Sequence, residues 1–239
     1  MKTLAAILAG GSGLRVGGET PKQLLPLRGK PVLSHCIAAF DAHPGIDGVV
    51  VVCREDLIPA IETLVRAEDY TKVLGVIPGG ADRSGSSVAA IRFAKAWQQD
   101  AETQDVKLLL HDAARPLVDA GIISRCLEAL ERFEAVEAVA PATDTIVRRS
   151  PDGLLEDVLP RDQIALVQTP QGFRLKVIAE AYRRAMEDPA FTATDDCSVV
   201  RRYLPRTPVR LVEGSPRNIK LTYPTDLPVL EALMGTKDA

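Results

Sequence analysis

The segment LAAILAGGSGLRVGGETPK (residues 4–22) decides the fold of this 239-residue chain. Its apolar start, Leu4–Leu8, passes directly into a glycine-rich loop, which predicts a buried strand followed by a turn. A lysine before an apolar run is also typical of a secretory signal, but this run is short and leads into glycines followed by Arg15 and Lys22. We therefore predict the first strand of a sheet rather than a cleaved leader.

The same alternation of apolar runs with amphipathic segments continues along the chain. It implies right-handed crossovers and an α/β fold of Rossmann-like type, with a mostly parallel, twisted sheet flanked by helices. The runs expected to form strands are 4–8, 49–52, 73–77, 106–110, 136–140, 166–168 and 209–212. The segments expected to form helices are 31–42, 55–68, a stretch through 88–94, 119–133, 175–186 and the chain after Pro224.

The alternation breaks after Pro141. Residues 144–147 and 154–159 flank the sequence RSPDG (149–153), which is typical of a hairpin turn. We predict a single domain over residues 1–239 with a projecting β-arm inserted at about 142–165. The arm is either an edge excursion or a dimerisation element that packs on a second subunit.

Composition excludes several classes of protein. A formal charge of −3 argues against general binding to nucleic acid or to anionic membranes. No run approaches the roughly 18 apolar residues that a membrane span requires. The four cysteines are far apart and form no C-x-x-C pair, which suits reduced thiols in a cytoplasmic protein.

The glycine loop predicts a phosphate site, because glycine lets backbone amides approach a phosphate chain closely. It is not a P-loop, since it lacks the Gly-Lys-Ser/Thr ending, and Val16 stands where a dinucleotide fingerprint has its third glycine. Two cations, Arg15 and Lys22, follow the glycines closely.

Three further elements carry polar side chains. Asp112 follows the run LLL (108–110), where open parallel sheets bind ligands. The loop PGGADRSGSS (78–87) follows another strand, and NIKLT (218–222) places Lys220 late in the chain. Taken singly, each also fits an ordinary turn, cap or surface charge.

Together the elements resemble a known family. The order A-G-G-x-G-x-R, P-K-Q, G-G-x-x-R, H-D-A-A-R-P, D-T, Q-T-P-Q, T-D-D and N-I-K-x-T is similar to that of the 2-C-methyl-D-erythritol 4-phosphate cytidylyltransferases, over residues 4–230. The resemblance implies transfer of the cytidylyl group of CTP to a methylerythritol phosphate, with release of pyrophosphate and with Mg²⁺ bound mainly through the CTP phosphates. It also implies a homodimer in which the arm reaches the neighbouring subunit's site.

The resemblance assigns roles to individual residues. As catalytic groups it implies Arg15 and Lys22 on the triphosphate and Arg161 and Lys220 on the acceptor phosphate. The implied nucleotide contacts are Ala9, Gly10, Gly11, Gly13, Gly79, Gly80, Asp82, Ser87 and Asp112. The implied acceptor contacts are Asp112, Arg115, Thr145, Arg161, Thr169, Thr194 and Lys220. No protein ligand to a metal is implied.

One departure concerns the loop S-G-S-S between Arg83 and Val88, which is one residue longer than the family pattern. Ser84, Ser86 and Ser87 are all candidates for the serine near the base, and Ser87 is the one assigned above.

The reaction explains why no nucleophile–base pair is needed, because a phosphate monoester is already anionic at neutral pH. The histidines, among them His111 beside Asp112, are therefore expected to be structural. A ribitol 5-phosphate cytidylyltransferase is the nearest alternative; the segment TDDCS (194–198) favours the erythritol acceptor. A dinucleotide-dependent oxidoreductase and a non-catalytic nucleotide-binding module fit less well.

Overall fold

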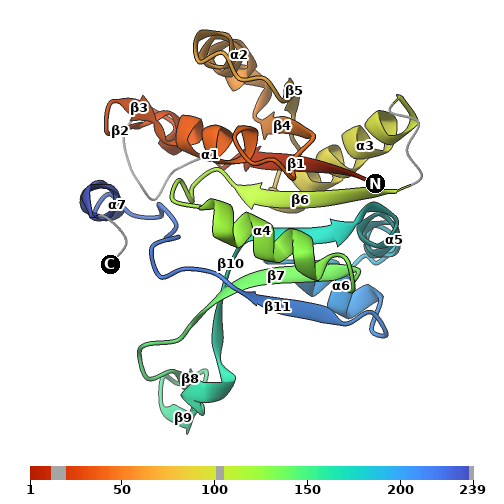
Figure 1. Cartoon of the computed structure of the whole chain (residues 1–239). Coiled ribbons are helices and arrows are strands. Elements are labelled where there is room, and N and C mark those ends of the chain that lie inside the picture. The colour runs from red at the N-terminus through yellow and green to blue at the C-terminus, as the bar shows by residue number, and fades with distance from the viewer. Residues whose placement is uncertain (12–19, 101–104, 237–239) are drawn as a thin grey trace.

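A computed structural model describes residues 1–11, 20–100 and 105–236 of the chain (Figure 1). Within these residues a seven-stranded sheet has the order β11-β7-β10-β6-β1-β4-β5. Its strands are β1 (Lys2–Ala9), β4 (Gly48–Cys53), β5 (Val73–Pro78), β6 (Val106–Asp112), β7 (Ala135–Pro141), β10 (Ala165–Arg174) and β11 (Val209–Glu213).

The direction of the strands confirms the mostly parallel sheet, with one exception. β1 pairs in parallel with β4 and β6, β4 with β5, and β11 with β7. β10 is antiparallel to both of its neighbours, β6 and β7. After β7 the chain runs out into the arm and returns beside the same strand without a crossover helix, so the returning strand must run in the opposite direction.

Helices cover both faces of the sheet, because successive side chains of a strand point to opposite sides. Leu4, Ala6 and Leu8 of β1 pack in one core cluster, and Ala5, Ile7 and Ala9 pack in another. The first core also contains residues of α3 (Arg83–Asp100), α5 (Leu175–Ala185) and α6 (Asp196–Tyr203). The second contains residues of α1 (Val32–Asp41), α2 (Ile58–Ala67) and α4 (Ala120–Ala129).

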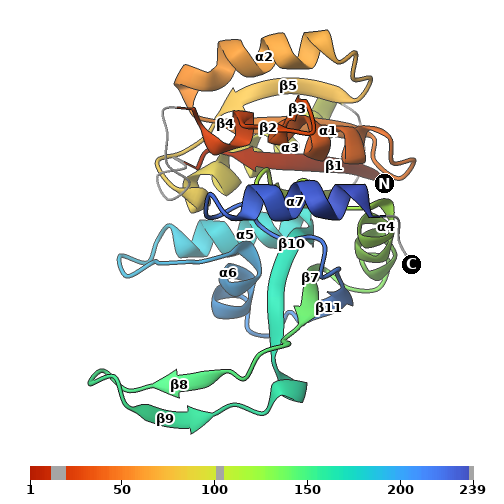
Figure 2. The same ribbon diagram turned by 90° about the vertical axis from the view of Figure 1, so that its left-hand side faces the viewer.

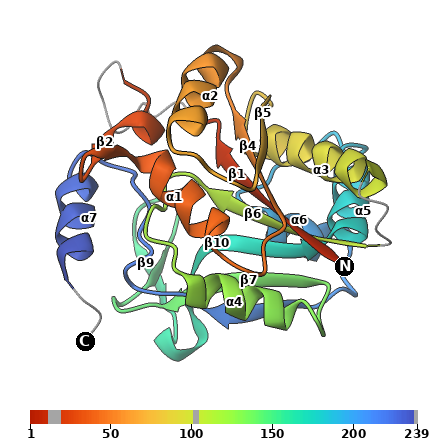
Figure 3. The ribbon, with the colours of Figure 1, turned by 45° about the horizontal axis from the view of Figure 1, so that its top comes forward.

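A third, smaller cluster joins the start and the end of the chain. The short hairpin β2 (Pro26–Leu27) and β3 (Lys30–Pro31) contacts α7 (Asp226–Gly235), as Figure 3 shows. Leu27, Leu221 and Leu230 are fully buried there. This contact brings the segment that follows β11 next to the segment that follows the glycine loop.

The expected arm (residues 142–165) is present and projects from the body of the protein (Figure 2). Its strands β8 (Val147–Arg149) and β9 (Leu155–Val158) are antiparallel, and every residue of both is exposed. Gly153 has φ +84°, a backbone conformation that glycine adopts without a Cβ clash. Among the described residues, no helix is long and apolar enough to span a bilayer.

Candidate active site

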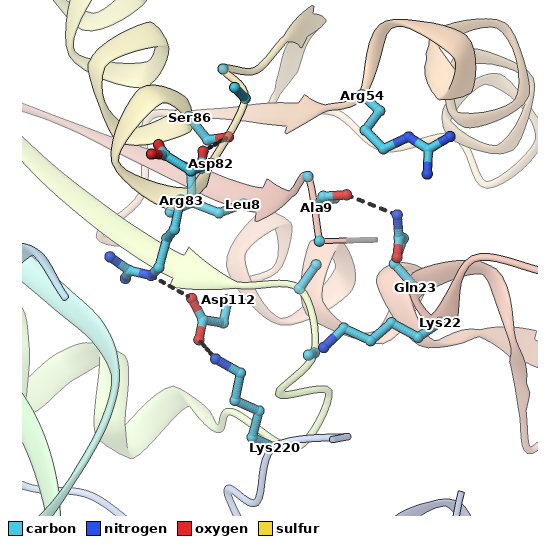
Figure 4. Close-up of a pocket in the computed structure, with 16 residues that line it drawn as sticks. Leu8, Ala9, Lys22, Gln23, Arg54, Asp82, Arg83, Ser86, Asp112 and Lys220 are labelled. Atoms are coloured by element: carbon cyan, nitrogen blue, oxygen red, sulfur yellow. Dashed lines mark hydrogen bonds and ion pairs between the residues drawn. The ribbon is translucent and has the colours of Figure 1, made fainter. Parts of the chain in front are cut away.

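A cavity of about 510 Å³ opens where neighbouring parallel strands end (Figure 4). Strands β1, β4, β5 and β6 all point their carboxyl ends at it, which is where open α/β sheets bind ligands. The lining residues are Leu8, Ala9, Gly10, Gly11, Lys22, Gln23, Arg54, Gly80, Ala81, Asp82, Arg83, Ser86, Asp112, Ala113, Ala114 and Lys220.

The glycine loop enters the cavity directly after β1. Ala9, Gly10 and Gly11 line it as expected, while Gly13 and Arg15 lie outside the described residues. The buried amide of Gln23 donates from Nε2 to the carbonyl of Ala9 at 2.8 Å, which holds the end of β1 in place.

The loop between β5 and α3 forms the opposite wall. Gly80 lines the cavity, and a Cβ at this position would lie 2.5 Å from the Cα of Gly85, so only glycine permits this close backbone approach. Gly79 lies behind it and donates from its N–H to the carbonyl of Cys53 at 2.7 Å. Asp82 Oδ1 accepts from the N–H of Gly85 at 2.7 Å at the start of α3.

The structure corrects the choice of serine in this loop. Ser87 is fully buried, and its hydroxyl donates to the carbonyl of Arg83 at 3.2 Å inside α3. Ser86 lines the cavity, and its Oγ would lie 3.1 Å from a Cβ placed on Gly10. Ser86, and not Ser87, therefore faces the glycine loop.

Asp112, at the end of β6, lies between two cations. Its Oδ2 is 2.6 Å from Nζ of Lys220, and its Oδ1 is 3.3 Å from Nε of Arg83. Burial would raise the pKa of the Asp112 carboxyl, but Arg83 and Lys220 outweigh burial and hold this pKa well below its ordinary value. The carboxylate is therefore ionised at neutral pH and is held from both sides.

A neutral histidine supports the Asp112 backbone. Nε2 of His111 donates to the carbonyl of Arg115 at 3.1 Å, which leaves Nδ1 to accept from the Thr169 hydroxyl at 3.0 Å. The same hydroxyl accepts from the N–H of Asp112 at 3.1 Å. Burial lowers the pKa of His111 to about 4, so at neutral pH this ring orients the loop and carries no proton to the cavity.

Two residues with expected acceptor contacts therefore have internal partners. The Thr169 hydroxyl is engaged by His111 and Asp112. Arg115 donates from Nη1 to the carbonyl of Asn218 at 2.7 Å and from Nη2 to that of Val167 at 3.1 Å. Neither side chain lines the described cavity, and Arg115 ties the Asp112 loop to β10 and to the N-I-K segment.

The two lysines come from opposite ends of the chain. Lys22 lies on a short 3-10 helix (Lys22–Leu24), and its Nζ donates to the carbonyl of Leu221 at 3.1 Å. Lys220 is the residue before Leu221, and Leu221 is buried in the third core cluster. The packing of this cluster therefore brings both ammonium groups to one cavity. The sequence predicted phosphate contacts for both lysines, and the structure places both in the lining of the cavity.

The remaining expected residues lie away from the cavity of their own chain. Thr145 is exposed on the arm, and Arg161 at its base donates from Nη1 to the carbonyl of Thr143 at 2.9 Å. The exposed Thr194 donates to Asp195 Oδ2 at 3.1 Å before α6. None of these three residues lines the described cavity.

Three of the charged or amide side chains that line the described cavity had no role assigned from the sequence: Arg54, Gln23 and Arg83. Gln23 and Arg83 belong to the P-K-Q and G-G-x-x-R motifs, so the sequence contained enough information to place both at the site. Arg54 follows β4 directly, and only its position after a strand end pointed to the site.

Residues 1–11, 20–100 and 105–236 contain no group of three or more His, Cys, Asp or Glu side chains arranged to hold a metal ion.

A second layer of polar side chains lies behind the cavity. Nε2 of Gln171 donates to Glu137 Oε1 at 2.6 Å, and Oε1 of Gln171 accepts from the N–H of Asp196 at 2.9 Å. Burial, and after it the charge of Asp195, raises the pKa of Glu137 to about 7. Glu137 is thus protonated in the folded state at a pH where an unfolded chain has lost this proton.

This acid makes stability depend on pH with a definite sign. The folded pKa is raised from 4.5 to about 7, so the stability that the proton provides is lost as pH rises through this window. Glu137→Gln keeps an acceptor for Gln171 and removes the titration. At pH 8 we expect the variant to exceed the wild type by roughly 1–3 kcal/mol in free energy of unfolding, and at pH 4, below the unfolded pKa, this advantage should nearly vanish.

Urea unfolding at both pH values measures this difference directly. Glu128→Gln, at an exposed position on α4, is the matched control and should follow the wild-type pH dependence. If the free energy of unfolding changes equally with pH in Glu137→Gln and in the wild type, Glu137 does not titrate in this range.

Comparison with known proteins gives the family. The family model described as 2-C-methyl-D-erythritol 4-phosphate cytidylyltransferase matches residues 3–236. The enzyme of that name from Thermobifida fusca (strain YX) is 47% identical over 98% of this chain and 94% of its own length. A bifunctional ribulose 5-phosphate reductase/CDP-ribitol pyrophosphorylase from Haemophilus influenzae is 38% identical over 99% of this chain but only 49% of its own length.

A solved structure agrees with both sequence comparisons. The crystal structure of 4-diphosphocytidyl-2C-methyl-D-erythritol synthase from Anaerococcus prevotii DSM 20548 superposes with a TM-score of 0.84, at 25% identity, over 98% of this chain and 99% of that one. With its fold, its motifs and the cavity at its strand ends in agreement, this chain belongs to the 2-C-methyl-D-erythritol 4-phosphate cytidylyltransferase family.

Proposed function

We propose that this chain transfers the cytidylyl group of CTP to 2-C-methyl-D-erythritol 4-phosphate, giving 4-diphosphocytidyl-2-C-methyl-D-erythritol and pyrophosphate. One observation carries the proposal: Lys22 and Lys220 meet at a glycine-walled cavity beside an ionised Asp112. Such an arrangement suits a reaction between two phosphates, whose main obstacle is repulsion of like charges.

In this reaction an oxygen of the acceptor phosphate forms a bond to the α-phosphorus of CTP. The bond from that phosphorus to the bridging oxygen breaks, and pyrophosphate leaves with its electron pair. No proton has to be removed from the nucleophile, which agrees with the neutral, internally bonded His111. Lys22, together with Arg15, would stabilise the charge that develops on the leaving group, and Lys220 would hold the attacking phosphate in line.

The nucleotide is expected to lie along the glycine-rich walls. Ala9, Gly10 and the loop 79–82 would contact the base and the ribose, with Ser86 in place of Ser87. Asp112 would accept from hydroxyl groups of the ribose or of the acceptor, since an ionised carboxylate only accepts hydrogen bonds.

Mg²⁺ is expected to enter with CTP. In the described part of the cavity the lining carboxylates are Asp82 and Asp112, and Asp112 already faces a cation with each oxygen. These contacts leave phosphate oxygens and water as the main ligands, which suits an ion bound through the nucleotide. When bound, the ion would offset part of the negative charge of the triphosphate.

The arm supports a homodimer. Its exposed apolar side chains include Val147 (46% exposed), Leu155 (66%) and Val158 (52%), and an isolated hairpin is marginal in water. Arg161 and Thr145 do not line the described cavity of their own chain, and a twofold partner would let them reach the neighbouring site. The four cysteines are free and buried, which favours the cytoplasm as the place of reaction.

Pyrophosphate release tests the proposal and its alternative together. We expect rapid release from CTP with methylerythritol phosphate and much slower release with ribitol 5-phosphate. Ribitol is the runner-up acceptor, because the Haemophilus relative carries a CDP-ribitol pyrophosphorylase activity in its name. Faster turnover with ribitol 5-phosphate would reverse the assignment of the acceptor and leave the nucleotide site unchanged.

Base selectivity is a separate prediction. The carbonyl groups of the loop 79–82 can accept from the cytosine amino group, and a pocket fitted to a pyrimidine has little room for a purine. We expect kcat/KM for CTP to exceed that for ATP or GTP by about 10²-fold or more. Comparable rates with ATP in the same pyrophosphate assay would contradict the assigned base loop.

A further inference from the structure

The Asp112 carboxylate has two counter-ions that differ in how firmly they are held. Lys220 is the more exposed, with 38% of its side chain accessible, whereas 26% of the Arg83 side chain is accessible. Arg83 also reaches a second carboxylate, Asp196, whose Oδ2 lies 2.7 Å from Nη1 and whose side chain is fully buried. The Arg83 guanidinium is thus held by two carboxylates, whereas among the described residues the Lys220 ammonium pairs only with Asp112 (Figure 4).

Asp196 is itself anchored by two neighbouring elements. Its Oδ1 accepts from the hydroxyl of Tyr182 on α5 at 2.6 Å, and its N–H donates to Gln171 on β10 at 2.9 Å. Both partners are almost completely buried. A buried carboxylate held in this way is costly to leave without its cation, so Arg83 cannot easily turn away from it.

From this geometry we infer that Arg83 is a positioning residue, which keeps Asp112 ionised and oriented when Lys220 moves toward a substrate phosphate. A phosphate dianion near Lys220 competes with Asp112 for the ammonium group. Without a second cation, Asp112 would then be left as a nearly buried charge that tends to take up a proton or to turn. Arg83 prevents both outcomes, because its ion pair with Asp196 holds it beside Asp112 and keeps it from moving to the phosphate.

The inference rests on the proposed function, since the competing phosphate is that of the acceptor or of CTP. Its sharpest test is a double-mutant cycle between Arg83→Gln and Asp112→Asn. If Arg83 acts through Asp112, Arg83→Gln lowers kcat/KM by about 10-fold or more in the wild type but by no more than about 2-fold when residue 112 is already Asn. Equal losses in both backgrounds would overturn the inference.

The pH profile is the readout that a merely structural role would not move. Besides Arg83, the charged or titratable groups that influence Asp112 in the described part of the chain include Lys220, Arg115, His111 and Cys36. Removing the Arg83 charge should raise the pKa of Asp112 once a bound phosphate engages Lys220, so the acid limb of kcat, which reports the substrate-bound enzyme, moves to higher pH by about one unit or more. An unmoved acid limb in an active Arg83→Gln enzyme would contradict the inference.

Two further variants keep the test decisive. Arg92→Gln, at an exposed position on the same helix, is the matched control and should leave both activity and pH profile unchanged. If Arg83→Gln does not fold, Asp196→Asn removes the anchor while keeping its size, and its loss of kcat/KM should likewise disappear in the Asp112→Asn background. An additive loss there would count against the inference.

The same cycle is measured on the affinity for CTP by calorimetry, which needs no turnover. A wild-type chain that binds CTP but transfers it to neither polyol phosphate would overturn the proposed function alone. Coupling between residues 83 and 112 in CTP affinity would still support the role of Arg83, and its absence from both readouts would refute that role.

Discussion

Replacing Lys22 with alanine is expected to lower kcat by about 10²-fold or more, because it removes a cation aimed at the charge that develops on the leaving pyrophosphate. The Lys22 ammonium lines the cavity and is held toward it by the carbonyl of Leu221 at 3.1 Å. Most of the effect should fall on kcat rather than KM, since the charge on the bridging oxygen grows only in the transition state.

Replacement by arginine distinguishes an electrostatic role from an acid–base role. Lys22→Arg keeps the charge and should partly restore turnover, because no proton transfer is required of this residue. Lys30→Ala is the matched control: Lys30 is exposed on the β2–β3 hairpin and pairs with Glu68 at 2.6 Å, outside the cavity. Steady-state kinetics with CTP measures kcat and KM for the three variants and the wild type. Near-normal turnover of Lys22→Ala would mean that the loop is only a structural turn.

Mixed dimers should recover activity that neither parent has. If the arm carries Arg161 into the partner's cavity, Arg161→Ala and Lys22→Ala homodimers are each nearly inactive. A heterodimer of the two has one site with both lesions and one site with none. We expect about half of the wild-type activity for each purified heterodimer.

A reciprocal heterodimer serves as the control. A wild-type chain paired with a chain that carries both Lys22→Ala and Arg161→Ala has one lesion in each site when the sites are shared, and it should be inactive. If Arg161 acts within its own subunit, the two results are exchanged: the first heterodimer is inactive and the reciprocal one retains about half of the activity. Two affinity tags, purified in sequence, isolate each species for the pyrophosphate assay.

The prediction of strands succeeded because central parallel strands are buried on both faces and therefore appear as continuous apolar runs. The run 4–8 lies within β1, and 106–110 lies within β6, at the centre of the sheet. The ends of helices were less certain. The predicted helix 119–133 ends at Ala129 in α4, yet Phe133 still packs against the core, so the apolar pattern outlasts the helix.

Helix α6 was not expected, because residues 194–198 were interpreted only as part of an acceptor motif. The signal for a helix was present: Asp195 caps α6 by accepting from the N–H of Ser198 at 2.8 Å. The direction of β10 was also not predicted, because the apolar pattern of a strand does not show which way the strand runs in the sheet. The arm returns the chain beside β7, and this return makes β10 antiparallel.

The sequence by itself determined the fold class and the family, and it named the candidate cations for phosphate, because each depends on local pattern or on the order of motifs. Only the tertiary structure decided that Ser86 faces the cavity and that Thr169 and Arg115 serve the Asp112 loop from behind. It also placed Arg83 between Asp112 and Asp196, residues far apart in the chain. A side chain's partners depend on how the elements pack, and the order of the motifs does not record that packing.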